Sequence, residues 1–456
     1  MPIPSPATAQ ATIGEAESAG LHTQALSSDT KGLRKAAVMG ATRTAIQIIA
    51  GFLSVKVTSV YLGPAGIGVL AQLQGLITAT LGVIANGTNT GLVRLSAEYR
   101  DDPARRRLLV STAARSLLSV GLPVALILIF AAPLIATKLL GDVSHANAVR
   151  VFGLCYVFGL FASIFTGLSN GAKDYGSTTL MDAGRTVLAL LLFTVLSPLF
   201  GVPGGLMAAA IAPLATVAVA VAVSRGKRWW QGRMFSSGFS RTELGRLAGF
   251  IPMAACAVLG EPVAQLFVRD TLATHSGLGA VGLLQGVWRL SDLYVTVFTG
   301  IFSMYYLPRF VEVRTASELY REILRALGTI IPAVAAGSFA IYLLRDFLIS
   351  LAYSREFMPM RDLFGWQMVG NVLKMTGWLF GYVLVARISP LKICLLELAK
   401  GVAWVGFAIW FVPRLGAIGA VHSFVATYAV YVLIAATSVF VVGRRMKQAE
   451  LRESAA

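Results

Sequence analysis

Four ionisable residues lie deep within stretches that are otherwise apolar: Glu261, Arg289, Asp292 and Lys374. An ionised side chain at the centre of a bilayer costs about 2.5–3.5 kcal/mol on insertion scales, so charge at that depth usually serves binding, transport or pairing. Arg289 and Asp292 are three residues apart, which places them on one helix face, where they can neutralise each other. Lys374 has no acidic neighbour in the sequence. Because lysine and arginine bind phosphate groups well, unpaired cations at this depth favour an anionic substrate.

Several other charges lie closer to the ends of the apolar stretches. Arg43 and Arg115 are about ten ångström inside them by the helical rise, and binding and snorkelling to the headgroups are equally good explanations there. Glu397–Lys400 and Asp182–Arg185 have the spacing of ion pairs on one helix face, and each pair is either structural or functional.

Glu261 is followed by Pro262, which interrupts the helical hydrogen bonds. A lone carboxylate beside such a kink suits proton uptake or binding of a coupling cation. A carboxylate neutralised by a basic partner far away in sequence is the alternative.

The composition requires a membrane environment for these charges. Of the 456 residues, 56% are hydrophobic and 13% are charged, whereas a soluble domain has about 25% charged residues. Long apolar runs separated by short polar breaks predict an all-α, multi-pass membrane protein. The net charge of +17 is scattered over many loops, which argues against a nucleic-acid partner. The three cysteines are far apart, and no cofactor or metal site is expected.

The apolar runs predict twelve spans in two lobes of six. The expected spans cover residues 36–61, 65–97, 108–137, 147–171, 176–199, 203–223, 244–270, 278–307, 325–351, 359–387, 391–412 and 417–442. The resulting organisation is a disordered cytoplasmic tail (1–35), an N-terminal lobe (36–223), a basic cytoplasmic linker (224–243), a C-terminal lobe (244–442) and a second cytoplasmic tail (443–456). Lysine and arginine are concentrated in the loops on the side of the termini, which predicts that both termini are cytoplasmic.

A weak internal repeat supports the division into lobes. At an offset of 211 residues, Gly66, Gly68, Gln74 and Gly75 align with Gly277, Gly279, Gln285 and Gly286. Two similar lobes around a central cavity are a recurrent plan of secondary transporters. In this register the positions of Arg289 and Asp292 carry no charge in the first lobe.

The second lobe resembles a known family. The stretches LLQGVWRLSDLYVTVFTGIFSMYYLPRF, IIPAVAAGSFAIYLLRDF and MRDLFGWQMVGNVLKMTGWLFGYVLVAR are similar to the Wzx flippases, above all to those handling enterobacterial common antigen. YLGPAGIGVLAQLQGL and GTNTGLVRLSAEYRDDP are similar in the first lobe. This family belongs to the superfamily that includes the MATE-like multidrug exporters. The resemblance implies a MATE-like fold of two six-helix lobes around a V-shaped cavity, in the bacterial inner membrane.

The resemblance also implies a function. The expected activity is translocation of an undecaprenyl-pyrophosphate-linked oligosaccharide, such as an O-antigen or enterobacterial common antigen unit, from the cytoplasmic to the periplasmic leaflet by alternating access. A gradient of H⁺ or Na⁺ would drive it, and membrane lipids, a polysaccharide polymerase and a chain-length regulator are the candidate partners. Asp292 and Lys374, within SDLY and GNVLK, match the family pattern best. Binding of the substrate is expected from the cations Lys374, Arg289, Arg43 and Arg115, and ion coupling or charge pairing from Asp292, Glu261 and Glu397.

Two other functions remain open from the sequence. A multidrug exporter of the same fold, moving organic cations, would favour an acidic and aromatic cavity, whereas basic residues exceed acidic ones within these spans. A membrane-embedded polysaccharide polymerase or ligase would need catalytic groups on sizeable outer loops. The predicted outer loops, such as FGVPGG, are short, which favours a transporter over an enzyme.

Overall fold

In the computed structural model, every regular element is a helix over the residues that it describes, namely 6–227, 229–230 and 232–455. Side chains are described from residue 49 onward, except for 228, 231–233, 297, 303, 304 and 453–456. The long helices are α1 (Pro6–Glu98), α2 (Pro103–Phe130), α4 (Ala146–Gly171), α5 (Tyr175–Ser224), α7 (Ile251–Ile301), α9 (Ala316–Leu343), α11 (Phe364–Arg387) and α12 (Pro390–Ala455). The shorter helices are α3 (Ala132–Ile135), η1 (Ala136–Leu140), η2 (Val143–His145), η3 (Gly232–Phe235), α6 (Arg241–Ala248), η4 (Phe302–Tyr306), α8 (Leu307–Glu312), α10 (Arg345–Ala352) and η5 (Arg355–Leu363).

Eight helices in the described part of the chain are long and apolar enough to cross a membrane. Four of them, α1, α5, α7 and α12, each contain one glycine with a positive φ, at Gly63, Gly201, Gly277 and Gly416 respectively. Glycine tolerates this conformation because it has no Cβ, so the chain can turn sharply there. Each of the four therefore consists of two helical segments that meet at a glycine.

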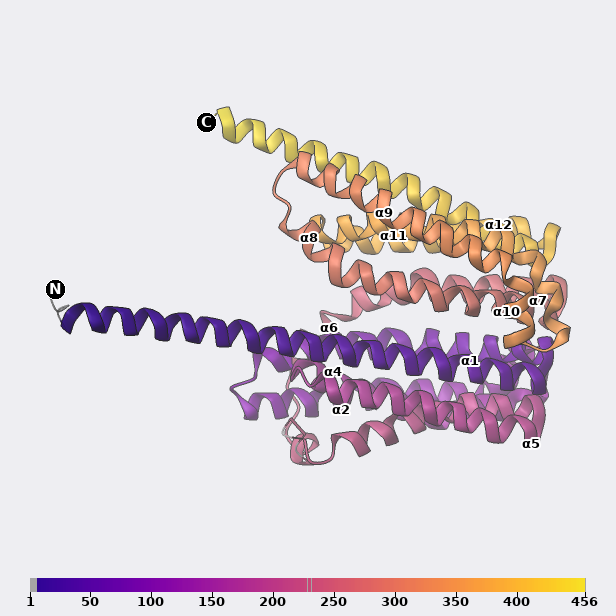
Figure 1. Ribbon diagram of the computed structural model, residues 1–456. Coiled ribbons are helices and arrows are strands. Elements are labelled where there is room, and N and C mark those ends of the chain that lie inside the picture. The colour runs from indigo at the N-terminus through magenta and orange to yellow at the C-terminus, as the bar shows by residue number, and fades with distance from the viewer. Residues whose placement is uncertain (1–5, 228, 231, 456) are drawn as a thin grey trace.

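The helices form two bundles, and both chain ends lie at the same end of the molecule (Figure 1). At the opposite end, the first bend of each bundle meets the other bundle. A Cβ added to Gly68 would lie 2.0 Å from the carbonyl oxygen of Leu278, and one added to Gly282 would lie 1.8 Å from that of Pro64. Only glycine permits backbones to approach so closely, so these two contacts join the lobes at the end away from the termini.

The two contacts reveal the register of the internal repeat. Gly68 and Gly282 are 214 positions apart, as are Pro64 and Leu278, and also the bends at Gly63 and Gly277. The offset of 211 predicted from sequence is therefore wrong by three residues. A shift of three residues is close to one helical turn and leaves the same face apolar, so the sparse Gly and Gln coincidences could not detect it. In the corrected register, Arg289 and Asp292 correspond to Gly75 and Thr78, which are also uncharged.

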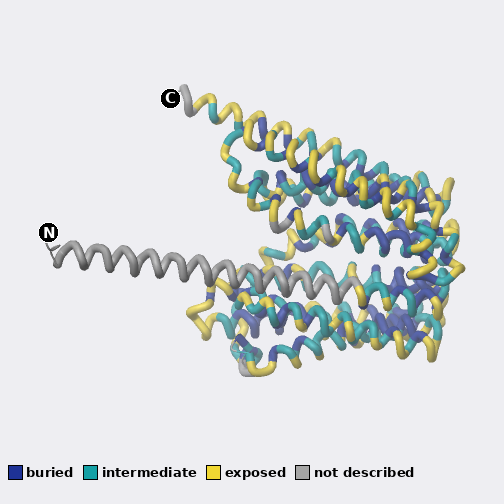
Figure 2. Tube along the Cα trace, viewed as in Figure 1, coloured by how far each residue is buried: buried dark blue, intermediate teal, exposed yellow. Residues whose placement is uncertain are grey.

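Burial follows this architecture. Buried positions gather where helices face one another, and exposed positions lie on the outward faces (Figure 2). Many outward positions are large and apolar, such as Leu122, Leu126, Phe339 and Leu433, which is typical of surfaces that face lipid. One buried apolar cluster fills the N-terminal bundle, and a second runs from the contact between the lobes through the C-terminal bundle.

Two segments differ from the expected organisation. The structure places residues 6–35, for which the sequence predicts a disordered tail, within α1, while residues 1–5 lie outside the described part. The described part of the basic linker folds onto the N-terminal lobe. Trp229 is buried there and donates its Nε1 hydrogen to Asp174 Oδ2 at 2.9 Å, and Trp230 packs on Phe165. Both tryptophans therefore contact protein of the N-terminal lobe.

Candidate functional site

The C-terminal lobe contains a network of two buried lysines and two partly buried glutamates. Lys374 Nζ on α11 lies 2.8 Å from Glu261 Oε1 on α7, and Lys400 Nζ on α12 lies 3.6 Å from Glu261 Oε2 and 2.6 Å from Glu397 Oε2. The hydroxyl of Tyr428 donates to Glu261 at 3.1 Å. The hydroxyl of Tyr431 donates to Glu397 at the same distance, 3.1 Å. The formal charges of the four ionised groups cancel, and every carboxylate oxygen has a donor.

Close helix packing brings these groups together. A Cβ on Gly401 would lie 2.4 Å from the carbonyl oxygen of Gly260, so α7 and α12 cross in contact at the two glycines. This crossing places Glu261 beside Glu397 and Lys400. Lys374 also lies over the ring of Trp378, 4.9 Å from its centroid, which adds a cation–π contact.

The network changes the interpretation of two residues. The sequence analysis predicts an unpaired Lys374 that binds an anion, but the structure pairs Lys374 with Glu261, 113 positions away. Lys374 is 7% exposed and Lys400 is 5% exposed, so neither ammonium group faces a large opening. Of the two explanations left open for Glu261, the structure supports the carboxylate neutralised by a distant base.

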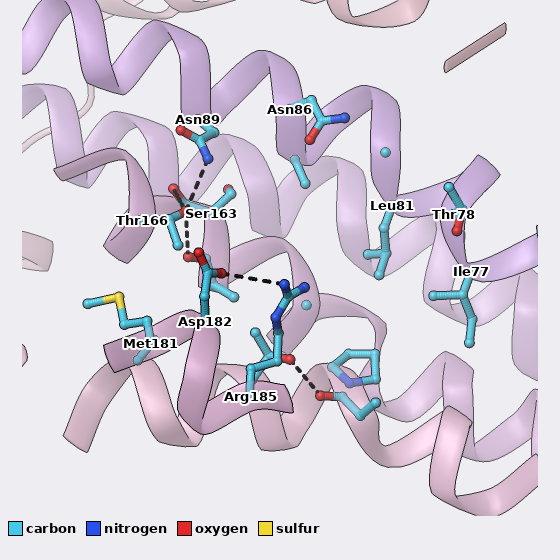
Figure 3. Close-up of a pocket in the computed structure, with 18 of the residues that line it drawn as sticks. Ile77, Thr78, Leu81, Asn86, Asn89, Ser163, Thr166, Met181, Asp182 and Arg185 are labelled. Atoms are coloured by element: carbon cyan, nitrogen blue, oxygen red, sulfur yellow. Dashed lines mark hydrogen bonds and ion pairs between the residues drawn. The ribbon is translucent and has the colours of Figure 1, made fainter. Parts of the chain in front are cut away.

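A large cavity lies within the N-terminal lobe, between the second segment of α1, α4 and both segments of α5. It has a volume of about 840 Å³. Hydroxyl and amide side chains cover much of its wall, and they are Thr78, Asn86, Asn89, Ser163, Thr166, Asn170, Thr178, Thr186 and Thr216. In this wall, Asn89 donates a hydrogen bond to Thr166 at 3.1 Å, and Arg185 and Asp182 form an ion pair at 3.4 Å (Figure 3). Such a wall can exchange hydrogen bonds with a polyhydroxylated molecule.

Arg289 extends this cavity toward the second lobe. An adjoining hollow of about 420 Å³ shares Ile77, Thr78 and Thr186 with the large cavity, and Arg289 lines its other side. Among the side chains that the structure describes, Arg289 has neither an ion-pair nor a hydrogen-bond partner. Three residues on, Asp292 is exposed and lines a third hollow of about 240 Å³, which shares Gly51 and Arg289 with the second one. The two are neighbours, as the spacing predicted, but they are not within ion-pair distance.

The remaining predicted site residues lie elsewhere. Arg115 is exposed on α2, on the same face as the exposed apolar residues Leu118, Leu122 and Leu126, and it is absent from the cavity wall. This placement agrees with the snorkelling alternative. The side chain of Arg43 lies outside the described ones. Glu397 belongs to the lysine–glutamate network, away from Arg289.

The sequence prediction missed the polar wall of the cavity. The sequence does contain a pattern that indicates this wall. Asn86 and Asn89 lie on one face of α1, Thr166 and Asn170 lie on one face of α4, and all four interrupt apolar spans. The sequence prediction was built on charged residues alone. The wall has fewer cations than the sequence predicted. Among the described residues, only Arg185 and Arg289 contribute cations to the two connected hollows.

Comparisons with known proteins identify the family. Residues 33–314 match the family described as Polysaccharide biosynthesis protein. The chain is 34% identical over 415 residues to the lipid III flippases of Escherichia coli K12 and Shigella flexneri, which covers 91% of this chain and 99% of each relative.

Solved structures share the fold. A multidrug resistance MATE family transporter in an inward-facing conformation aligns with a TM-score of 0.73 at 18% identity, covering 90% of this chain and 99% of the other. The lipid II flippase MurJ, in an inward closed conformation, aligns with a TM-score of 0.66 at 12% identity, covering 91% and 90%. The predicted all-helical, MATE-like membrane fold and the assignment as a transporter and not an enzyme are confirmed. The chain belongs to the polysaccharide biosynthesis protein family, the family of the Wzx-type flippases.

Proposed function

We propose that this protein is a flippase for a polyprenyl-pyrophosphate-linked oligosaccharide. The observation that carries the proposal is the polar cavity of about 840 Å³ in the N-terminal lobe, which continues to Arg289, an arginine without a partner among the described side chains. Hydroxyl and amide groups suit the sugars, and the guanidinium group of Arg289 suits the pyrophosphate. The relatives named lipid III flippase support the same substrate class, and an O-antigen unit or the enterobacterial common antigen unit is its expected form.

The topology proposed here has twelve spans. Eight long apolar helices, four of them divided at a glycine, give twelve segments that each cross the bilayer once. The basic loops near the termini favour a cytoplasmic location for both ends and the inner membrane of a bacterium for the protein. Since the lobes meet at the end away from the termini, the cavity would be accessible from the cytoplasmic side in this conformation.

Although Lys374 neutralises Glu261 in this conformation, we assign ion coupling to the network that these residues form in the C-terminal lobe. The network of Glu261, Glu397, Lys374 and Lys400 lies within the helix packing of this lobe, and none of its residues lines the large cavity. Protonation of a glutamate would leave a lysine unbalanced and change the packing of α7, α11 and α12. H⁺ is the coupling ion that fits this arrangement best, because the ammonium groups of Lys374 and Lys400 already lie beside the carboxylates, where a metal cation would have to bind.

The multidrug-exporter alternative is less well supported. An exporter of organic cations would need a carboxylate without a partner on the cavity wall. Asp182 in the large cavity is paired with Arg185, and Asp292 lies in the smaller neighbouring hollow. The cation Arg289 faces the connected space instead.

Complementation tests the proposal directly. The chain would be expressed in an Escherichia coli strain lacking its lipid III flippase, and export of the finished antigen would be measured together with the lipid-linked precursor. Restored export and loss of accumulated precursor support the proposal. An unchanged precursor pool, with the protein present in the membrane, would contradict it for this substrate, and export of dyes by the same cells would favour the multidrug alternative.

A further inference from the structure

A second, smaller hollow lies at the end of the N-terminal lobe nearest the chain termini. It measures about 80 Å³ and is lined by Ser96, Arg100, Arg106, Gly171 and Trp229, with apolar residues completing the wall. No lining residue is shared with the transport cavity. Since one water occupies about 30 Å³ of liquid, the hollow has room for two or three waters or for one small oxyanion.

Two buried polar atoms in this hollow have no partner within the described residues: Ser96 Oγ and Arg106 Nε. Ser96 is 6% exposed, so its hydroxyl has no ready access to bulk water. Helix α4 makes room for it with a glycine, because a Cβ on Gly171 would lie 2.0 Å from Ser96 Oγ. Buried polar atoms normally have partners, so two orphaned ones facing a common space indicate a missing ligand.

The charge of the hollow indicates which ligand. Both ionisable side chains in its wall are arginines, Arg100 at the exposed mouth and Arg106 inside. Asp174, which accepts a hydrogen bond from the wall residue Trp229, is already engaged with Ser177 and Lys227. Among the described residues, the wall therefore presents hydrogen-bond donors with positive charge and no carboxylate oxygen, which is the environment that phosphate oxygens prefer.

We infer that this hollow binds a phosphate group, held by the guanidinium groups of Arg100 and Arg106 and the hydroxyl of Ser96. The phosphate is either the headgroup of an anionic membrane lipid or free phosphate. Trp229 forms one wall, so an occupied site would fix the linker between the lobes to the N-terminal lobe.

Thermal unfolding of the full chain in nanodiscs tests this inference in two arms. In one arm, discs of phosphatidylcholine are titrated with inorganic phosphate at constant ionic strength. In the other, phosphatidylglycerol replaces part of the phosphatidylcholine. A ligand that binds the folded state raises the unfolding temperature in a concentration-dependent way. Stabilisation in the second arm alone identifies a lipid headgroup, and stabilisation in the first identifies free phosphate.

Matched variants locate the effect. Arg106→Gln should weaken the apparent affinity at least about tenfold, because it removes charge-assisted hydrogen bonds. Arg107→Gln removes the same charge one residue away, outside the hollow, and should leave the affinity within about twofold. Ser96→Ala should weaken binding without lowering the unfolding temperature of the ligand-free protein, since the lost hydroxyl had no partner. Absence of stabilisation in both arms, or equal losses for the two arginine variants, would overturn the inference.

Discussion

Lys374 and Glu261 form an ion pair of 2.8 Å between α11 and α7, inside a lobe whose outer surface is apolar. Removing one member of a buried ion pair is costlier than removing both, because it leaves an uncompensated charge, at roughly 3–5 kcal/mol. The pair therefore makes the effect of each substitution depend on the other.

Lys374→Met should lower the unfolding temperature of the purified protein substantially. Adding Glu261→Gln to it should recover much of the loss, because Lys400 and Glu397 then remain as a balanced pair. A double-mutant cycle measured by thermal unfolding in one detergent gives the coupling. Lys392→Met, at an exposed position of α12, is the control and should be nearly neutral. Additive effects of the two substitutions would show that the pair is not coupled.

Arg289→Gln should reduce translocation of the lipid-linked oligosaccharide at least about tenfold, since a lost hydrogen bond to a charged group is worth roughly 1.5–3 kcal/mol. Its stability should change little, because Arg289 has no partner among the described side chains. Arg115→Gln removes another intramembrane arginine, one that faces outward from α2, and should leave translocation within about twofold. The measurement is the rate of antigen export in the complementation strain, normalised to protein in the membrane. Equal rates for the two variants would remove Arg289 from the binding site.

Gly68→Ala should disfavour the conformation in which the lobes meet at the end away from the termini. Its methyl group would lie 2.0 Å from the carbonyl oxygen of Leu278, so the two backbones must separate. Gly279→Ala is a close control, because nothing lies within 4 Å of its added Cβ. Spin labels on either side of the contact would report a longer distance in Gly68→Ala alone. An unchanged distance would show that the contact relaxes locally.

How much of this could be predicted depended on whether the signal was local. Apolar run lengths gave the membrane class, and the breaks between predicted spans at residues 62–64 and 271–277 contain the bends at Gly63 and Gly277. The partner of Lys374 could not be predicted, since Glu261 lies on another helix and only the crossing at Gly260 and Gly401 brings them together. The outward orientation of the Arg115 side chain could not be predicted from its depth in the span, because depth does not specify which helix face meets lipid.

The linker between the lobes should detach from the N-terminal lobe in acid, through Asp174. Burial of this carboxyl opposes its ionisation, but hydrogen bonds from Ser177 and Trp229 and the charge of Lys227 together hold its pKa below its ordinary value of 3.8. A lowered pKa contributes stability above the ordinary value, and that stability is lost as the pH falls through the lowered value. Docking of the linker should therefore be complete at neutral pH and weaken progressively below about pH 4.

Asp174→Asn tests this dependence. The amide preserves the shape of the side chain but removes the charge, so the variant should be less stable than the wild type at pH 7 and should differ from it less and less as the pH falls below about 4. Protection of the backbone around Trp229 from hydrogen exchange is the measurement that localises the effect to the linker. Asp101→Asn, at an exposed position of the loop between α1 and α2, serves as the control, and its stability should follow that of the wild type at every pH. If Asp174→Asn retained full protection at neutral pH, the carboxylate would not be the group that holds the linker.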